Sequence, residues 1–326
     1  MKLVSFKYKD YSSIGFLDKG NGESLHSDGY VVDLFKDTSP LPNNMLEYLK
    51  YLVSRAGESN VIGANEIDNI LQNGVGEFYD LKDVVIDAPL QKPLSFRDAY
   101  AFRKHVEAGR KNRGLDMISE YDDFPVFYFS NHHSITGPGN IYVQRQHLKK
   151  LDFEFEIGII IAKKGRNIKS CDAMNYVAGF TIINDWSERD IQLKEMKLNL
   201  GPAKGKDFAT SMGPYLVTLD ELEDVKIIKD DGPRYDLKMK AYINDQLVSE
   251  DNFKNMTWSF SDIIERVSSG VDLYPGEIIG SGTCSTGCLL ELNLTNKNPY
   301  WLKEGDVVRL EVDRLGSLIN KICLQK

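Results

Sequence analysis

Several common features are missing from this 326-residue sequence. It contains no apolar run long enough to cross a bilayer. Its first ten residues mix charged with apolar side chains, unlike a signal peptide. Positive charge is not in excess either, since 48 acidic residues against 40 Lys and Arg give a formal net charge of −8. We therefore expect a protein that binds neither nucleic acid nor membrane.

Cysteine is scarce, and its spacing matches no zinc motif. The four cysteines are Cys171, Cys284, Cys288 and Cys323. We interpret them as free thiols in a reducing compartment, and expect a cytoplasmic protein. The sequence also lacks a Gly-x-Ser-x-Gly elbow and a His-Glu-x-x-His motif, so a serine hydrolase or a zinc protease has no support.

The most informative stretch is Leu-Asp-Phe-Glu-Phe-Glu-Ile-Gly at residues 151–158. On a strand, its apolar side chains point to one face while Asp152, Glu154 and Glu156 point to the other. The apolar continuation to Ala162 predicts an interior strand. Glu154 and Glu156 can then reach one cation together. The alternative is a half-exposed strand with an acidic outer face.

The remaining pattern predicts a mostly β protein of the α+β class, with a boundary near residue 90. We expect a small N-terminal β/α domain at 1–90 and a larger β domain at 91–326. Helices are predicted at 43–55, 65–72, 96–113 and 261–267, and strands at 124–129, 177–184, 215–217, 237–243, 277–279, 289–294 and 307–312. A continuous helix at 96–113 would place Asp98 and His105, two turns apart, on one face.

Two further segments carry candidate chemistry. The spacing of Asp185, Arg189 and Gln192 places them on one face of a helix that starts after a buried strand, where a cation and an anion could bind. The alternative is that Asp185 only caps the helix. Lys206 follows a glycine-rich turn that fails the phosphate-loop pattern. It is either a fixed positive charge beside an oxyanion or a solvated lysine.

Taken in order, these motifs resemble the fumarylacetoacetate hydrolase family over about residues 90 to 315. The motifs are Asp98…His105, Glu154-Phe-Glu156, Asn184-Asp-Trp-Ser-Glu-Arg-Asp-Ile-Gln192, Gly205-Lys-Asp-Phe-Ala-Thr210, Gly280-Ser-Gly-Thr283 and Leu290-Glu291-Leu292. The resemblance implies a rolled β-sheet catalytic domain, preceded by a small SH3-like β domain.

The resemblance also implies roles for individual residues. Asp98, Glu154, Glu156 and Asp185 would bind Mg²⁺ or Ca²⁺, with Mn²⁺ possible, and Lys206 and Thr210 would lie beside the metal. His105 would activate water and Glu291 would orient it, while Arg189, Gln192 and Lys206 would stabilise an oxyanion. Tyr100, Tyr128 and Thr283 would contact the substrate.

The implied activity is metal-dependent hydrolysis of a C–C bond in a β-diketo acid, either fumarylacetoacetate or a related acylpyruvate, by a homodimer. Met196 stands where the family has a substrate-contacting tyrosine, and Gly114 where it has an arginine. These departures count against fumarylacetoacetate itself as the substrate more than against the chemistry. A decarboxylase or tautomerase of a 2-oxo or 2-hydroxydienoic acid, such as oxaloacetate, is the alternative enzyme. A non-catalytic, calcium-dependent ligand-binding protein is the alternative of another class.

Overall fold

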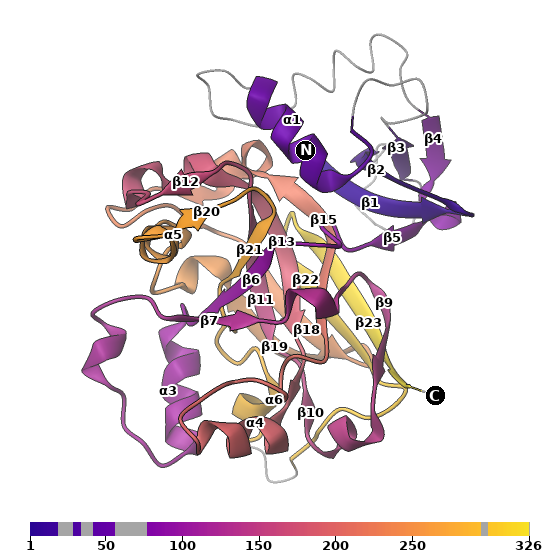
Figure 1. Ribbon diagram of the computed structural model, residues 1–326. Helices are drawn as coiled ribbons and strands as arrows, with labels where there is room; N and C mark the ends of the chain where they lie inside the picture. Colours follow the sequence, from indigo (N-terminus) through magenta and orange to yellow (C-terminus); the bar gives the residue numbers. More distant parts are fainter. Residues whose placement is uncertain (19–28, 34–41, 56–76, 295–298, 326) are drawn as a thin grey trace.

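The computed structural model describes residues 1–18, 29–33, 42–55, 77–294 and 299–325 (Figure 1). The helix predicted at 65–72 lies outside these residues. The helices are α1 (Met45–Arg55), α3 (Arg103–Asn112), α4 (Arg189–Met196), α5 (Phe260–Ser268) and α6 (Leu289–Leu292). None of the described helices is long and apolar enough to cross a membrane.

A large mixed sheet forms the centre of the molecule. Its main path runs β4 (Glu77–Asp80), β3 (Tyr30–Asp33), β2 (Tyr11–Asp18), β1 (Lys2–Tyr8), β15 (Thr210–Thr218), β13 (Val177–Asp185), β11 (Phe155–Ile161), β21 (Glu277–Gly280), β6 (Ser95–Ala99) and β7 (Phe127–Ser130), with β5 (Val85–Asp87) beside β1 and β8 (Ile135–Thr136) beside β15. The mostly β class expected from the sequence is confirmed.

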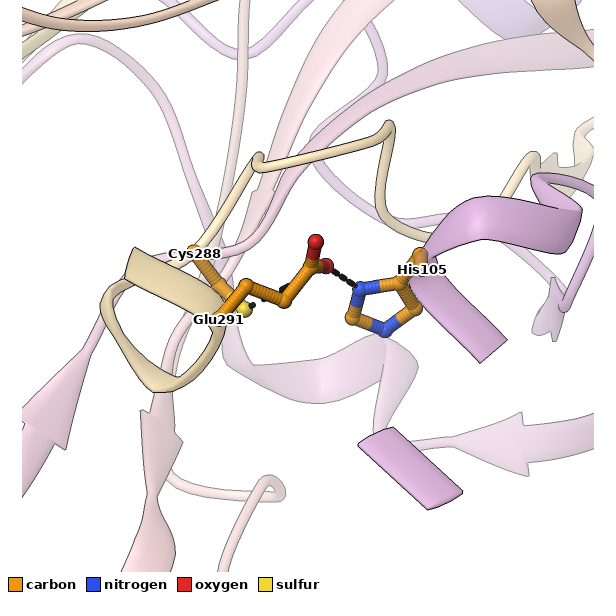
Figure 2. Close-up of side chains that lie close together, drawn as sticks. All are labelled: His105, Cys288 and Glu291. Carbon is orange, nitrogen blue, oxygen red and sulfur yellow. Dashed lines mark hydrogen bonds and ion pairs between the residues drawn. The ribbon is translucent and has the colours of Figure 1, made fainter. Parts of the chain in front are cut away.

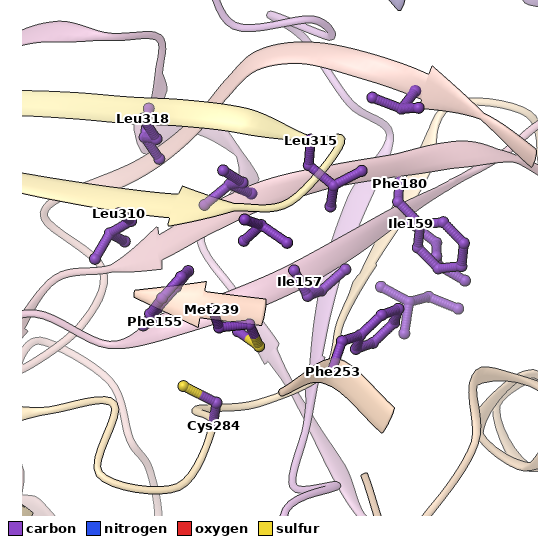
Figure 3. Close-up of a cluster of buried hydrophobic side chains, with 14 of the residues drawn as sticks. Phe155, Ile157, Ile159, Phe180, Met239, Phe253, Cys284, Leu310, Leu315 and Leu318 are labelled. Atoms are coloured by element: carbon purple, nitrogen blue, oxygen red, sulfur yellow. The ribbon is translucent and has the colours of Figure 1, made fainter. Parts of the chain in front are cut away.

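A second sheet packs against the middle of the first. Its order is β19 (Gln246–Asn252), β18 (Lys238–Ile243), β22 (Val307–Val312), β23 (Gly316–Leu324) and β9 (Gly139–Val143). Figure 3 shows Phe155 and Ile157 of β11 near Met239 of this sheet and Ile159 near Phe180, and all of them belong to one buried cluster with Leu310. Short pairs complete the described strands: β10 (Leu151–Asp152) with β14 (Ser187–Glu188), β12 (Gly165–Arg166) with β20 (Asp272–Leu273), and β16 (Lys226–Ile227) with β17 (Arg234–Tyr235).

Strand β11 is the interior strand that the sequence predicted, since β13 and β21 flank it. Phe155, Ile157 and Ile159 belong to the cluster between the two sheets, whereas Ile160 belongs to the cluster under α1. The alternation of side chains therefore aims Glu156 away from the core between the sheets. The acidic face is fully buried, so the alternative of a half-exposed strand is wrong.

The segment before residue 90 continues the large sheet, because β1 pairs with both β2 and β15. Helix α1 covers one face there: Tyr48 and Leu49 lie in the same buried cluster as Ile160 and Ile278. Residue 90 lies between β5, which pairs with β1, and β6, which pairs with β21. The division into two domains at residue 90 stays a prediction.

Three local predictions are wrong. Residues 96–113 are not one helix: Phe96 and Asp98 lie on β6, paired with β21 and β7, and α3 begins at Arg103. The short run at 289–294 forms helix α6, since four apolar positions alone do not separate helix from strand. Asp185 neither caps a helix nor shares a helical face with Arg189 and Gln192, because it is the last residue of β13. The cap of α4 is Glu188, which accepts a 2.6 Å hydrogen bond from Ile191 N.

The core between the sheets yields a stability prediction. Replacing Ile159, which is fully buried in β11, by Ala should lower the free energy of unfolding by about 2–5 kcal/mol because it leaves a cavity. The matched control is Ile228→Ala, at a side chain that is 74% exposed, and it should change stability by less than about 0.5 kcal/mol. Urea unfolding measures both; equal effects would contradict the assignment of the core.

Candidate active site

Neighbouring strands of the large sheet bring the predicted site residues together. Five of these residues lie on strands that follow one another in the sheet, with only β21 between β11 and β6. They are Thr210 on β15, Asp185 on β13, Glu156 on β11, Asp98 on β6 and Tyr128 on β7. The register pairs Asp185 with Thr210, and Asp98 with Tyr128. The sheet therefore fixes the spacing of side chains that are up to 112 residues apart in sequence.

Gly280 of β21 makes room for two carboxylates to meet. It lies opposite Asp98 on one side and Gly158 on the other. A Cβ atom on Gly280 would lie 2.5 Å from Oδ1 of Asp98 and 2.9 Å from Oε2 of Glu156. Any larger residue at this position would push the two carboxylates apart. The space that the two carboxylates need therefore explains why the first residue of the Gly280-Ser-Gly-Thr283 segment is a glycine.

Asp98, Glu156 and Asp185 form a buried carboxylate trio, with one oxygen of each within 4.8 Å of the others. Burial and the neighbouring carboxylates raise the pKa of Asp98 to about 7 and that of Glu156 well above its ordinary value. Neither oxygen of Glu156 has a donor among the described residues unless a proton lies between Glu156 and Asp98. A hard divalent cation with oxygen ligands fits this site.

Glu154 lies beside the trio but is paired with two cations. Its carboxylate contacts Lys206 Nζ through one oxygen and Arg189 through the other, at 2.7 Å from the arginine. Burial favours the neutral acid, yet these two ion pairs hold the pKa of Glu154 below its ordinary value. Of the four predicted metal ligands, Glu154 is thus the one whose two oxygens are each paired with a cationic side chain in the described structure.

Asp185 is held by three groups. Lys206 Nζ lies 2.6 Å from Oδ2, the Tyr128 hydroxyl donates to the same oxygen at 2.8 Å, and Thr210 lies 3.4 Å from Oδ1. Lys206 is buried rather than solvated, and its pKa is raised because the attraction of Asp185 and Glu154 outweighs the effect of burial. It therefore remains a positive charge beside the trio. Tyr128 contacts a predicted metal ligand directly.

Asp152 has a role that the sequence did not indicate. It is fully buried, and Oδ2 accepts a 2.7 Å hydrogen bond from Nε of Arg189. Its two oxygens also accept the backbone N–H groups of Leu289 and Leu290, at 2.7 and 2.9 Å. These are the first residues of α6, whose N-cap Cys288 makes no side-chain cap. Asp152 therefore fixes α6 to Arg189 of α4.

His105 and Glu291 form a buried pair from α3 and α6, which contact each other. Figure 2 shows Nδ1 of His105 directed at Oε1 of Glu291, which leaves Nε2 on the opposite edge of the ring. The other oxygen of Glu291 accepts the backbone N–H of Thr286 at 2.8 Å. Asp98 and His105 converge as expected, but from a strand and a separate helix instead of one helical face.

A cavity of about 340 Å³ joins these groups. Asp98 and Glu154 line it together with His105 and Glu291, as do the predicted substrate residues Tyr100, Tyr128 and Thr283. Arg189, Gln192 and Lys206 also line it, although Arg189 directs its Nη1 at Glu154 and at Gln192, 2.8 Å away. Met196 and Leu290 contribute to an apolar wall. Arg113 lines the cavity as well, near the position where the sequence departs from the family.

The crowding of the trio predicts a pH-dependent response to metal. In the metal-free protein the raised pKa of Asp98 means that stability falls as pH rises from 3.8 to about 7, because over this range the unfolded state has released a proton that the folded state still holds. Above pH 7 the buried Asp98 is ionised, so a cation would offset its charge without displacing its proton. Saturating Mg²⁺ should therefore raise Tm more at pH 8 than at pH 6.

Thermal unfolding with Mg²⁺ or with EDTA at the two pH values measures this difference. Asp98→Asn, which removes one charge of the trio at nearly constant volume, should reduce the pH dependence of the Mg²⁺ effect. A Tm increase that is equal at both pH values, or larger at pH 6, would contradict the assignment of the trio as the metal site.

Comparison with known proteins places this site in a family. The family model for the fumarylacetoacetate (FAA) hydrolase C-terminal region matches residues 95–323. A mitochondrial oxaloacetate tautomerase of Rattus norvegicus is 36% identical over 200 residues, which are 61% of this chain and 58% of the rat protein. The chain thus matches less than two thirds of that relative. A mitochondrial oxaloacetate tautomerase of Bos taurus is 33% identical over 327 residues, covering 99% of this chain and 91% of the bovine protein.

Solved structures share the fold. A fumarylacetoacetate hydrolase from Exiguobacterium antarcticum superposes with a TM-score of 0.72 at 23% identity, and both chains are covered completely. A 5-carboxymethyl-2-hydroxymuconate delta-isomerase from Mycobacterium smegmatis gives 0.64 at 19% identity with the same coverage. The two tautomerases are mitochondrial by name, and the cytoplasmic location expected here stays a prediction. With the family match over most of its length, the chain belongs to the fumarylacetoacetate hydrolase family.

Proposed function

We propose that this protein is a metal-dependent tautomerase, which interconverts the enol and keto forms of a 2-oxo dicarboxylic acid such as oxaloacetate. The observation that carries the proposal is the buried trio of Asp98, Glu156 and Asp185, of which Asp98 lines a cavity that His105 also lines. The bovine relative, which matches 99% of this chain, is named an oxaloacetate tautomerase, and this name favours tautomerisation over hydrolysis.

Asp98, Glu156 and Asp185 would hold Mg²⁺ or Ca²⁺, and Glu154 beside them would be released from Lys206 only at the cost of a buried ion pair. A bound divalent cation would polarise the 2-oxo group and so acidify the neighbouring CH₂ group. Lys206, fixed beside the trio, stabilises the negative charge that develops on the substrate oxygen. The cation and the lysine thus act on the same developing charge.

His105 is suited to move the proton. Glu291 engages Nδ1, so that the neutral ring presents the lone pair of Nε2. This atom takes a proton from the carbon next to the 2-oxo group and returns it to the enolate oxygen, or runs the same transfer in reverse. Only C–H and O–H σ bonds break or form while the π bond moves between C=O and C=C, and no water is consumed. Glu291 stabilises the charge that His105 acquires during the transfer.

Hydrolysis of an acylpyruvate is the second candidate, and the same His105–Glu291 pair supports it. There His105 takes a proton from water, the hydroxide attacks the remote carbonyl, and the C–C bond breaks to release an enolate that is then protonated. The two reactions differ in whether water enters the cavity. They therefore give different products from matched substrates.

The test follows the ultraviolet absorbance of enol-oxaloacetate, while a coupled assay measures pyruvate released from oxaloacetate and from acylpyruvates. Tautomerase activity predicts rapid loss of enol without pyruvate, abolished by EDTA and restored by Mg²⁺. Pyruvate from acylpyruvates would support hydrolysis instead, and pyruvate from oxaloacetate would support decarboxylation. Turnover that is indifferent to chelation would contradict all three metal-dependent reactions.

Removing His105 tests its role as the proton-transfer group. His105→Ala should lower kcat for tautomerisation by about 10²- to 10⁴-fold, the range for loss of a general acid–base. The matched control is His132→Ala, because His132 lies in the short 3₁₀ helix His132–Ser134 and does not line the cavity, and it should leave kcat unchanged. If His105→Ala retains full activity, another group moves the proton.

Asp152 should act as a positioning residue for the same pair, because it holds the helix that carries Glu291. Asp152→Asn should lower kcat by about 10- to 100-fold with little change in KM, the usual size for a supporting partner of a functional side chain. The same substitution in a Glu291→Gln background should cost little more. Asp262→Asn, which weakens the cap of the distant helix α5, is the control and should change stability alone.

A further inference from the structure

The helix pair beside the trio contains a second group of potential metal ligands. Nδ1 of His105, the thiol of Cys288 and a carboxylate oxygen of Glu291 lie within 4.8 Å of one another, and all three side chains are buried (Figure 2). Sγ of Cys288 is 3.8 Å from Oε1 of Glu291. The proposed reaction uses His105 and Glu291 and leaves the thiol without a task.

The two groups of ligands differ in chemical hardness. The trio offers only carboxylate oxygens, which suit Mg²⁺ and Ca²⁺, whereas the second group offers nitrogen, sulfur and oxygen, the set that Zn²⁺ prefers. Cys288 and Glu291 are three residues apart around the start of α6, so a single helical turn holds two of the ligands together. His105 and Glu291 line the cavity, which gives an ion a path to the site.

We propose that His105, Cys288 and Glu291 form an inhibitory zinc site, separate from the carboxylate trio. Zn²⁺ would bind Nδ1, the thiolate and one carboxylate oxygen, with a fourth position open to water. The thiol proton leaves to solvent, and the imidazole proton moves from Nδ1 to Nε2. Nε2 then lacks the lone pair that proton transfer requires. The inhibition rests on the proposed function, whereas the binding does not.

Binding is tested with Co²⁺ as a spectroscopic substitute for Zn²⁺, in excess Mg²⁺ to fill the trio. Cobalt bound to a thiolate gives a near-ultraviolet charge-transfer band that oxygen ligands do not give. The band should form in the unaltered protein and in Cys171→Ser, whose thiol is exposed, and should be lost in Cys288→Ser. No band in the unaltered protein, or an equal band in Cys288→Ser, would overturn the proposal.

X-ray absorption of the zinc-loaded unaltered protein tests the same site without relying on a folded variant. A sulfur neighbour at about 2.3 Å is expected, and a shell of nitrogen and oxygen alone would overturn the assignment. This readout does not depend on activity. If no 2-oxo acid is turned over, the proposed function fails while the cobalt and absorption experiments still decide the zinc site.

Inhibition is measured with saturating Mg²⁺ and increasing Zn²⁺. The half-inhibitory Zn²⁺ concentration should rise at least about 10-fold in Cys288→Ser and stay unchanged in Cys171→Ser, since loss of a ligand weakens a metal site by at least that factor. Equal inhibition of both variants would mean that Zn²⁺ acts by replacing Mg²⁺ at the carboxylates, and would overturn the inhibitory role of Cys288.

Discussion

The repulsion among buried carboxylates is the constraint on which this site depends. Five carboxylates are buried in this region: Asp98, Asp152, Glu154, Glu156 and Asp185. The buried cations that pair with them are Lys206 and Arg189. These cations pair with Asp152, Glu154 and Asp185, so the excess negative charge is concentrated on Asp98 and Glu156. Isolated buried charges are costly, and the folded chain either keeps protons there or binds a cation. A divalent ion would offset this excess where the protein's own cations do not reach.

The sheet makes such crowding possible because the burial of its apolar face stabilises the fold against the repulsion between the carboxylates. Phe155, Ile157 and Ile159 anchor one face of β11 between two sheets, so that the opposite face can hold Glu156 without bending the strand. Gly280 supplies the space between adjacent strands in which the carboxylates meet. The same rigidity that stabilises the fold therefore holds like charges close together.

The sequence predicted the parts of the site that follow from local alternation, and missed those that depend on tertiary contacts. Glu154 and Glu156 were recognisable because Phe153, Phe155 and Ile157 alternate with them. Asp98 and His105 were predicted to converge on one continuous helix. That helix was wrong, because the sequence does not show that residues 95–99 pair with β21 and β7. Asp152 was missed for a similar reason: its partners Arg189 and Leu289 are 37 and 137 residues away. Family motifs named the ligands, whereas only the structure shows that Glu154 is bound to cations.

The site is divided between two layers of the molecule, and this division explains how one fold can support different reactions. The carboxylate trio is built into adjacent strands, whose spacing the backbone hydrogen bonds fix. The His105–Glu291 pair comes instead from α3 and α6, which contact each other, and Asp152 accepts two backbone N–H groups at the start of α6. In the proposed function, a change in these helices would alter proton transfer or water access and leave the carboxylate trio in place. A relative named as a tautomerase and solved structures named as an isomerase and a hydrolase share the fold, so the fold alone does not decide which of these reactions occurs.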